Sequence, residues 1–200
     1  MTARPGKKLA DYEILLCVTG GISAYKAAEL VSRFVQADAG VTVAMTENAQ
    51  KFVGPSTFQA LTRRQVFTSM WTSAEDFKAQ HIALTERADI MLVVPATANI
   101  ISKFAAGQAD DLVSTLALSA FGACEILIAP AMNTRMWKAH PTQENIEKLK
   151  KWHMNIVGPD CGHLACGTTG EGRLADLDDI YAAAEQLLLK NPPKKANETD

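Results

Sequence analysis

Apolar residues fall into short, dense runs along this chain. Four runs have the length of β-strands: Ile14–Val18, Val41–Met45, Ile90–Val94 and Ile126–Ile128. All but the second are apolar at every position, and strands that are buried on both faces belong to parallel sheets covered by helices. The shorter apolar pair at 156–157 predicts a last strand.

The segments between these runs repeat their apolar residues at helical spacing. This spacing predicts helices over residues 27–34, 98–107 and 110–121, a further helix that begins near Pro141, and a final helix over residues 177–188. Strands that alternate with helices predict an α/β fold. The expected architecture is a single doubly wound domain, Rossmann-like or flavodoxin-like, with a parallel sheet and helices on both of its faces.

The composition agrees with one domain of ordinary size. Of the 200 residues, 48% are apolar and 21% charged, which is enough to bury a substantial core. We expect this domain to occupy residues 1–190. Residues 191–200 are polar and include two prolines, and we expect them to form a disordered tail.

Charge and hydropathy exclude several classes of function. The formal net charge is −2 and no basic tract is present, so a nucleic-acid partner is not expected. No apolar run approaches the roughly 20 residues that a membrane helix needs. The charged N-terminus carries no signal-peptide pattern. A cytoplasmic protein without membrane contact is the expectation.

The carboxyl ends of the predicted strands define an expected ligand site. In doubly wound sheets, ligands bind where the strands end and the loops begin. The segments that follow the four strands are 19–23, 46–48, 95–99 and 130–133, and we expect them to gather on one rim.

The glycine turn after the first strand favours a phosphate. The sequence Thr19-Gly20-Gly21-Ile22-Ser23 lacks the G-x-G-x-x-G fingerprint of dinucleotide sites. It nevertheless places small residues and N–H groups at the start of a helix, where a phosphate is stabilised by aligned donors. The hydroxyls of Thr19 and Ser23 favour phosphate contact over a turn that only needs glycine.

Two later segments, "VVPATAN" and "IAPAMN", share one form: an apolar strand, a proline, a small residue and an asparagine. Proline is expected to stop strand pairing, and the small residues let a flat ligand lie near the backbone. Asn99 and Asn133 offer donors and acceptors that suit a heteroaromatic edge or a carboxylate. The alternative is helix capping, which stays open for Asn99 in particular.

The histidines and cysteines carry weaker signals. His81 lies ahead of a strand, and its surroundings alone favour a helix residue over a base. The segment "CGHLACGTTGEG" suggests zinc through Cys161, His163 and Cys166, but it has no C-x-x-C pair and no clear fourth ligand. A mobile lid with a reactive Cys166, or a flexible loop with an inert one, are the remaining interpretations.

Four motifs taken together resemble one family. In chain order they are "VTGGISAYKAAEL", "VVPATANIISKFAAGQADDL", "APAMNTRMW" and "LACGTTGEGRLAD", and they resemble the flavin-dependent cysteine decarboxylases from about Ile14 to Asp176. The resemblance implies FMN bound at a subunit boundary of a homotrimer, or of a dodecamer built from trimers. It also implies oxidation of the cysteine thiol of 4'-phosphopantothenoylcysteine, loss of CO2 from the thioaldehyde, and reduction of the ene-thiol to 4'-phosphopantetheine in coenzyme A biosynthesis.

The same resemblance assigns roles to individual residues. His81 matches the catalytic histidine, which we expect to handle a proton during thiol oxidation, and Cys166 matches the proton donor of the final reduction. Asn133, next to Met132, matches the residue that holds the substrate carboxylate, and no metal is implied. Ile100 stands where the family often has threonine, so one polar flavin contact is in doubt. The positions that match the flavin site are Gly20, Gly21, Ser23, Thr46, Thr97, Ala98, Asn99 and Ala131.

Three other functions fit parts of this pattern. A peptidyl-cysteine decarboxylase of lantibiotic maturation would stop at the ene-thiol, and Cys166 in its glycine loop favours the full cycle instead. A prenyl-flavin synthase is not expected to carry both "PAMNTRMW" and "LACG". A regulatory protein that keeps the flavin fold without catalysis would be expected to show a damaged catalytic set or a long acidic tail.

Overall fold

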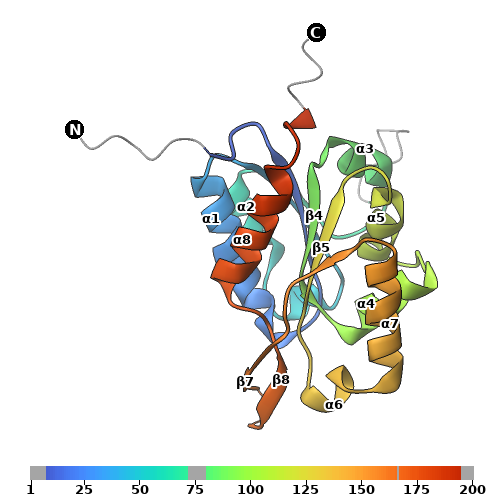
Figure 1. Ribbon diagram of the computed structural model, residues 1–200. Coiled ribbons are helices and arrows are strands. Elements are labelled where there is room, and N and C mark those ends of the chain that lie inside the picture. The colour runs from blue at the N-terminus through green and yellow to red at the C-terminus, as the bar shows by residue number, and fades with distance from the viewer. Residues whose placement is uncertain (1–7, 72–79, 166, 195–200) are drawn as a thin grey trace.

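The computed structural model describes residues 8–71, 80–165 and 167–194. Its centre is a six-stranded parallel sheet in the order β3-β2-β1-β4-β5-β6 (Figure 1). The predicted fold class is confirmed. The strands of this sheet are β1 Glu13–Val18, β2 Gly40–Met45, β3 Val66–Phe67, β4 Ile90–Ala96, β5 Glu125–Pro130 and β6 Asn155–Ile156.

Helices cover both faces of the sheet because alternate residues of each strand supply two separate cores. In β1, Ile14 and Leu16 face the core under α1, α2 and α8, while Leu15 and Cys17 face the core under α4, α5 and α7. This two-sided burial is why the strands are apolar at nearly every position. The helices are η1 Ile22–Tyr25, α1 Lys26–Gln36, η2 Ala49–Lys51, α2 Pro55–Thr62, α3 Gln80–Arg87, α4 Ala98–Ala106, α5 Leu112–Ala120, α6 Thr134–Trp137, α7 His140–Lys151 and α8 Leu177–Leu188.

A separate hairpin stands at the carboxyl end of the sheet (Figure 1). It consists of β7 Asp160–His163 paired antiparallel with β8 Thr169–Arg173. The sequence predicted only a glycine-rich loop here, and that prediction was wrong for the two arms. Glycines and polar residues hide the alternation of apolar residues from which a strand is normally recognised.

The prediction that prolines end strand pairing was also wrong in part. The register between β4 and β5 shifts after Val93, but pairing resumes where Ala96 faces Pro130. Pro95 therefore lies inside β4, whereas Pro130 is the last residue of β5, and the turns that carry Thr97 and Ala131 leave the sheet side by side. The backbone N–H of Ala131 donates to the carbonyl oxygen of Ala96 at 3.0 Å.

The opposite end of the sheet holds a buried ion-pair cluster. The carboxylate of Glu13 is 3% exposed and contacts the guanidinium groups of Arg64 and Arg87, with Nη2–Oε1 distances of 3.1 and 2.9 Å. A buried carboxylate is tolerated only when it is paired in this way. In the described part of the chain, no helix is long and apolar enough to cross a bilayer.

Candidate functional site

A cavity of about 1040 Å³ opens where β1, β2, β4 and β5 end. Residues from all four of the segments that follow these strands line it, together with the start of α1 and the inner side of the β7–β8 hairpin. The structure thus brings together every position that the sequence assigned to a flavin. These are Gly20, Gly21, Ser23, Thr46, Thr97, Ala98, Asn99 and Ala131.

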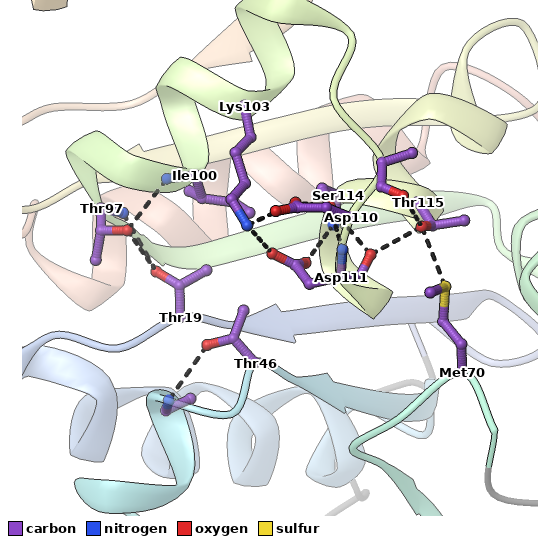
Figure 2. A network of polar contacts seen from close by, with 12 residues as sticks. Thr19, Thr46, Met70, Thr97, Ile100, Lys103, Asp110, Asp111, Ser114 and Thr115 are labelled. Carbon is purple, nitrogen blue, oxygen red and sulfur yellow. Dashed lines mark hydrogen bonds and ion pairs between the residues drawn. The ribbon is translucent and has the colours of Figure 1, made fainter.

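The floor of the cavity is held by a buried threonine. Thr19 is 1% exposed, its hydroxyl donates to the carbonyl oxygen of Pro95 at 2.6 Å, and its oxygen accepts from the N–H of Thr97 at 3.2 Å. These bonds tie the end of β1 to the end of β4 (Figure 2). Thr19 therefore shapes the site from below, rather than offering the ligand hydroxyl that the sequence suggested.

Gly20 is required by close packing. A Cβ at this position would lie 2.5 Å from the Cβ of Asn48, in the turn that follows β2. That turn is fixed by Thr46, whose hydroxyl oxygen accepts from the N–H of Ala49 at 3.2 Å (Figure 2). The glycine allows the β2 turn to close over the β1 turn, so that both contribute to one wall.

The helix start after β1 presents fewer donors than the sequence suggested. The N–H of Gly21 already donates to the carbonyl oxygen of Thr19 at 3.0 Å. The N–H groups of Ile22 and Ser23 belong to the first turn of η1, where backbone donors lack intrahelical partners. Ser23 is half-buried and lines the cavity. These first-turn groups remain the candidates for a phosphate.

Thr97, not Asn99, caps α4. The Thr97 hydroxyl oxygen accepts from the N–H of Ile100 at 3.3 Å, so the capping interpretation of Asn99 was wrong (Figure 2). Asn99 is exposed on the cavity side of the first turn. Ile100 is 1% exposed and belongs to the core, so the apolar residue that departs from the family pattern is used largely for packing.

Asn133 combines the two roles that the sequence left open. Its Oδ1 accepts from the N–H of Arg135 at 2.8 Å and caps the short helix α6, and the residue also lines the cavity. The side-chain amide nitrogen is a hydrogen-bond donor, which is the kind of group that suits a ligand carboxylate. Met132 and Met136 line the same wall.

Gly172 is a site residue that the sequence analysis missed. The N–H of Met132 donates to its carbonyl oxygen at 2.9 Å, which joins the β7–β8 hairpin to the turn that carries Asn133. Gly172 has φ of +132°, and a Cβ there would lie 2.2 Å from the carbonyl oxygen of Met132. The available signal was only that Gly172 is one of several glycines in this segment. Cys166 lies outside the described residues.

Lys103, Asp110 and Asp111 form a second feature that sequence reasoning missed. The Lys103 ammonium lies 2.6 Å from a carboxylate oxygen of each aspartate, and all three residues line the cavity (Figure 2). The available signal was spacing, since Lys103 follows Asn99 by one helical turn. The hydrogen bond from Lys103 holds the pKa of Asp110 below its ordinary value.

His81 lies away from this cavity. It is in the first turn of α3, on the face of the sheet that α5 also covers, and its carbonyl oxygen accepts from the hydroxyls of Thr85 and Ser119 at 3.0 and 3.4 Å. It is not among the residues that line the cavity. One copy of the chain therefore does not bring His81 to Asn133.

Burial keeps two of the described cysteine thiols protonated. Burial raises the pKa of the fully buried Cys17 thiol, and it raises the pKa of Cys124 to about 11, so both thiols are protonated near neutral pH. Cys161 is exposed on β7. Within the described ranges, no group of three His, Cys, Asp or Glu residues is placed to hold a metal ion.

Comparison with known proteins identifies the family of this chain. Residues 2–189 match the Flavoprotein family. The chain is 43% identical over 178 residues to the coenzyme A biosynthesis bifunctional protein CoaBC of Bacillus subtilis, covering 89% of this chain but 43% of that protein. The chain thus spans less than half the length of such bifunctional relatives.

A shorter relative and a solved structure extend the comparison. The chain is 40% identical over 176 residues to a probable phosphopantothenoylcysteine decarboxylase of Streptococcus mutans, covering 88% of this chain and 98% of that protein. The solved structure of the FMN-dependent cysteine decarboxylase SpaF is 28% identical, with a TM-score of 0.78, covering 90% of this chain and 97% of that one.

Proposed function

We propose, from the premise that this chain belongs to the Flavoprotein family, that it uses FMN to convert 4'-phosphopantothenoylcysteine to 4'-phosphopantetheine and CO2. The observation that carries this proposal is the cavity in which all eight expected flavin positions meet Asn133 and Met132. Similarity to a probable decarboxylase of nearly the same length supports the choice of substrate.

The residues present fit FMN on three counts. The cavity of about 1040 Å³ lies at the upper end of the ~300–1,000 Å³ typical of cofactor sites, so it has room for cofactor and substrate together. The small residues Gly21, Ala98 and Ala131 line the cavity and allow a flat ring to approach the backbone. First-turn N–H groups at Ile22 and Ser23 suit the phosphate of FMN.

Asn133, His81 and Cys166 each have one task in this reaction. Bound FMN supplies the oxidising power that turns the cysteine thiol into a thioaldehyde, which makes loss of CO2 from the adjacent carbon feasible. Asn133 holds the carboxylate through its amide, without the full positive charge that would stabilise the ground state and retain CO2. His81 accepts the proton that the thiol releases, because histidine is the side chain that most readily takes up and releases a proton near neutral pH.

We further propose that His81 acts in the cavity of a second copy of the chain, in a homotrimer or a dodecamer of trimers. The support is that His81 does not line its own cavity, while Ile82 next to it and Leu118 on α5, the helix that packs against α3, are 40% and 49% exposed. Large apolar side chains that are exposed together are typical of a surface that another subunit covers.

Cys166 completes the proposal as the proton donor when the ene-thiol is reduced to the thiol. Replacing Cys166 by Ser is expected to give CO2 and the ene-thiol, with little phosphopantetheine. Undiminished phosphopantetheine formation by this variant would count against the role. An enzyme whose wild type already stops at the ene-thiol would instead be a peptidyl-cysteine type of decarboxylase.

The first experiment is purification followed by absorption spectroscopy and a CO2-release assay. We expect yellow protein, FMN on extraction, and equimolar CO2 and phosphopantetheine from phosphopantothenoylcysteine. Flavin without turnover on this substrate would favour a binding protein. Replacing His81 by Asn is expected to leave FMN bound and to abolish CO2 release, and near-normal turnover would refute its role.

A mixing experiment tests the shared site. His81→Asn and Asn133→Asp should each be inactive, and Asp at 133 keeps the cap of α6 because its carboxylate also accepts from a backbone N–H. Co-expressed, the two variants are expected to form some cavities with both native residues and to recover part of the activity. No recovery from mixed oligomers would mean that His81 does not act across subunits.

A further inference from the structure

The positive and negative charges of the side chains that line the cavity sum to zero only when Lys103 is included. The described lining carries three cationic side chains and three carboxylates, with His163 taken as neutral. Loss of Lys103 would leave the lining with a net negative charge. The cations are Lys26, Lys103 and Arg173, and the carboxylates are Glu47, Asp110 and Asp111.

Lys103 is the best buried of the basic side chains whose ion pairs border this cavity. Its side chain is 16% exposed, whereas that of Arg173, which contacts Asp160 at 3.3 Å, is 43% exposed. Burial lowers the pKa of the Lys103 ammonium, but hydrogen bonds to Asp110 and Asp111 outweigh the burial, and its pKa lies above the ordinary value. Lys103 therefore stays charged through neutral pH.

The carboxylate of Asp111 is fixed by the fold, so it does not turn away when its partner is lost. Asp111 caps α5: its Oδ1 accepts from the N–H of Ser114 at 2.8 Å, and its own N–H donates to the Ser114 hydroxyl at 3.0 Å (Figure 2). Asp110 precedes it directly, and its Oδ1 pairs with Lys103 and accepts a long hydrogen bond of 3.4 Å from the Ser114 hydroxyl. The acids stand at this wall because α5 has to begin there.

We propose that Lys103 is a cofactor-positioning residue whose positive charge offsets part of the negative charge of Asp110 and Asp111, so that an anionic flavin phosphate can bind in the cavity they line. This inference rests on the proposed FMN cofactor. FMN and riboflavin differ only in the phosphate. An effect of the Lys103 charge should therefore change the affinity for FMN more than the affinity for riboflavin, whereas an effect of packing should change both alike.

The test compares flavin affinities of wild type, Lys103→Met, Lys103→Arg and the double variant Lys103→Met/Asp110→Asn. Flavin-stripped protein is titrated with FMN and with riboflavin at low and high salt, following flavin fluorescence, and thermal unfolding checks that each variant is folded. Lys103→Met is expected to raise the Kd for FMN at least tenfold, and the Kd for riboflavin no more than about threefold.

The controls restore charge balance in two ways. Lys103→Arg keeps the cation, and the double variant removes one acid together with the lysine, so both are expected to bind FMN within about threefold of wild type. High salt should reduce the effect of Lys103→Met. This pattern would support a charge role, because lost packing alone affects both ligands alike.

Four results would overturn the inference. Equal weakening of FMN and riboflavin by Lys103→Met would indicate packing, and a double variant as weak as Lys103→Met would exclude charge compensation. If wild type binds both flavins and Lys103→Met has the same Kd values as wild type, this inference is refuted and the proposed function stands. Wild type that binds neither flavin would refute both.

Discussion

Replacing Gly172 by Ala is expected to damage turnover far more than folding. The added Cβ would lie 2.2 Å from the carbonyl oxygen of Met132. An ordinary carbon–oxygen contact is about 3.3 Å, so the hairpin and the turn that carries Asn133 must separate by about 1 Å. The hydrogen bond from Met132 N–H to the Gly172 carbonyl oxygen, now 2.9 Å, would lengthen with them.

The magnitudes follow from that displacement. A shift of about 1 Å in a substrate-positioning group lowers turnover by about 10²-fold, and we expect a loss of this size in kcat/KM. Strain at a φ of +132° adds about 1–3 kcal/mol, and a weakened hydrogen bond about 1 kcal/mol, to the cost in stability. For a chain of this size, 1 kcal/mol corresponds to a change in Tm of about 2–4 °C.

The assay measures kcat/KM for CO2 release, the Kd for FMN and the Tm of the same preparation. The matched control is Gly122→Ala, because Gly122 also has a positive φ of +75° but no atom within 4 Å of an added Cβ. Its Tm should fall by a few degrees while kcat/KM stays unchanged. If Gly172→Ala keeps kcat/KM within threefold of wild type, the contact between hairpin and turn does not position the substrate.

Three further changes test other parts of the structure. Gly20→Ala should raise the Kd for FMN at least tenfold, because the Cβ would meet the β2 turn at 2.5 Å; unchanged fluorescence titrations would contradict this. Arg64→Met removes one guanidinium partner of the buried Glu13 carboxylate, and because Arg64 is 31% exposed we expect a loss of about 2–3 kcal/mol, measured by thermal unfolding, with FMN affinity preserved. With a pKa of about 11, Cys124 is about 10⁻³ thiolate at pH 8 and should react with iodoacetamide much more slowly than the exposed Cys161; equal rates in peptide mapping would refute this.

The sheet could be predicted from the sequence because its strands are buried on both faces. A strand such as β4 has to be apolar along its length, and such a run is visible without knowledge of its neighbours. Strand β3 was missed because Val66–Phe67 is two residues long and half-buried. The β7–β8 hairpin was missed because its glycines are explained only by contacts made elsewhere, such as that of Gly172 with Met132.

The rim of the cavity was predictable for a related reason. In a parallel sheet all strands end at the same side, so residues such as Thr97 and Asn133 could be placed together from strand order alone. Lys103 could not, since its position depends on how α4 packs beside the start of α5. The ion pair between Lys103 on α4 and Asp111 results from that packing, and the sequence shows no pattern for it beyond helical spacing.

The proposed role of His81 depends on a second copy of the chain. The family motif identifies the residue, but α3 holds it against α5, where Ser119 donates to its carbonyl oxygen at 3.4 Å. The same helix starts at Asp111, on the wall of the cavity. In the proposed oligomer, α5 therefore supports the cofactor wall of its own cavity with one end and the histidine of a neighbouring cavity with the other. A substitution inside α5 should then affect flavin affinity and proton transfer in different subunits.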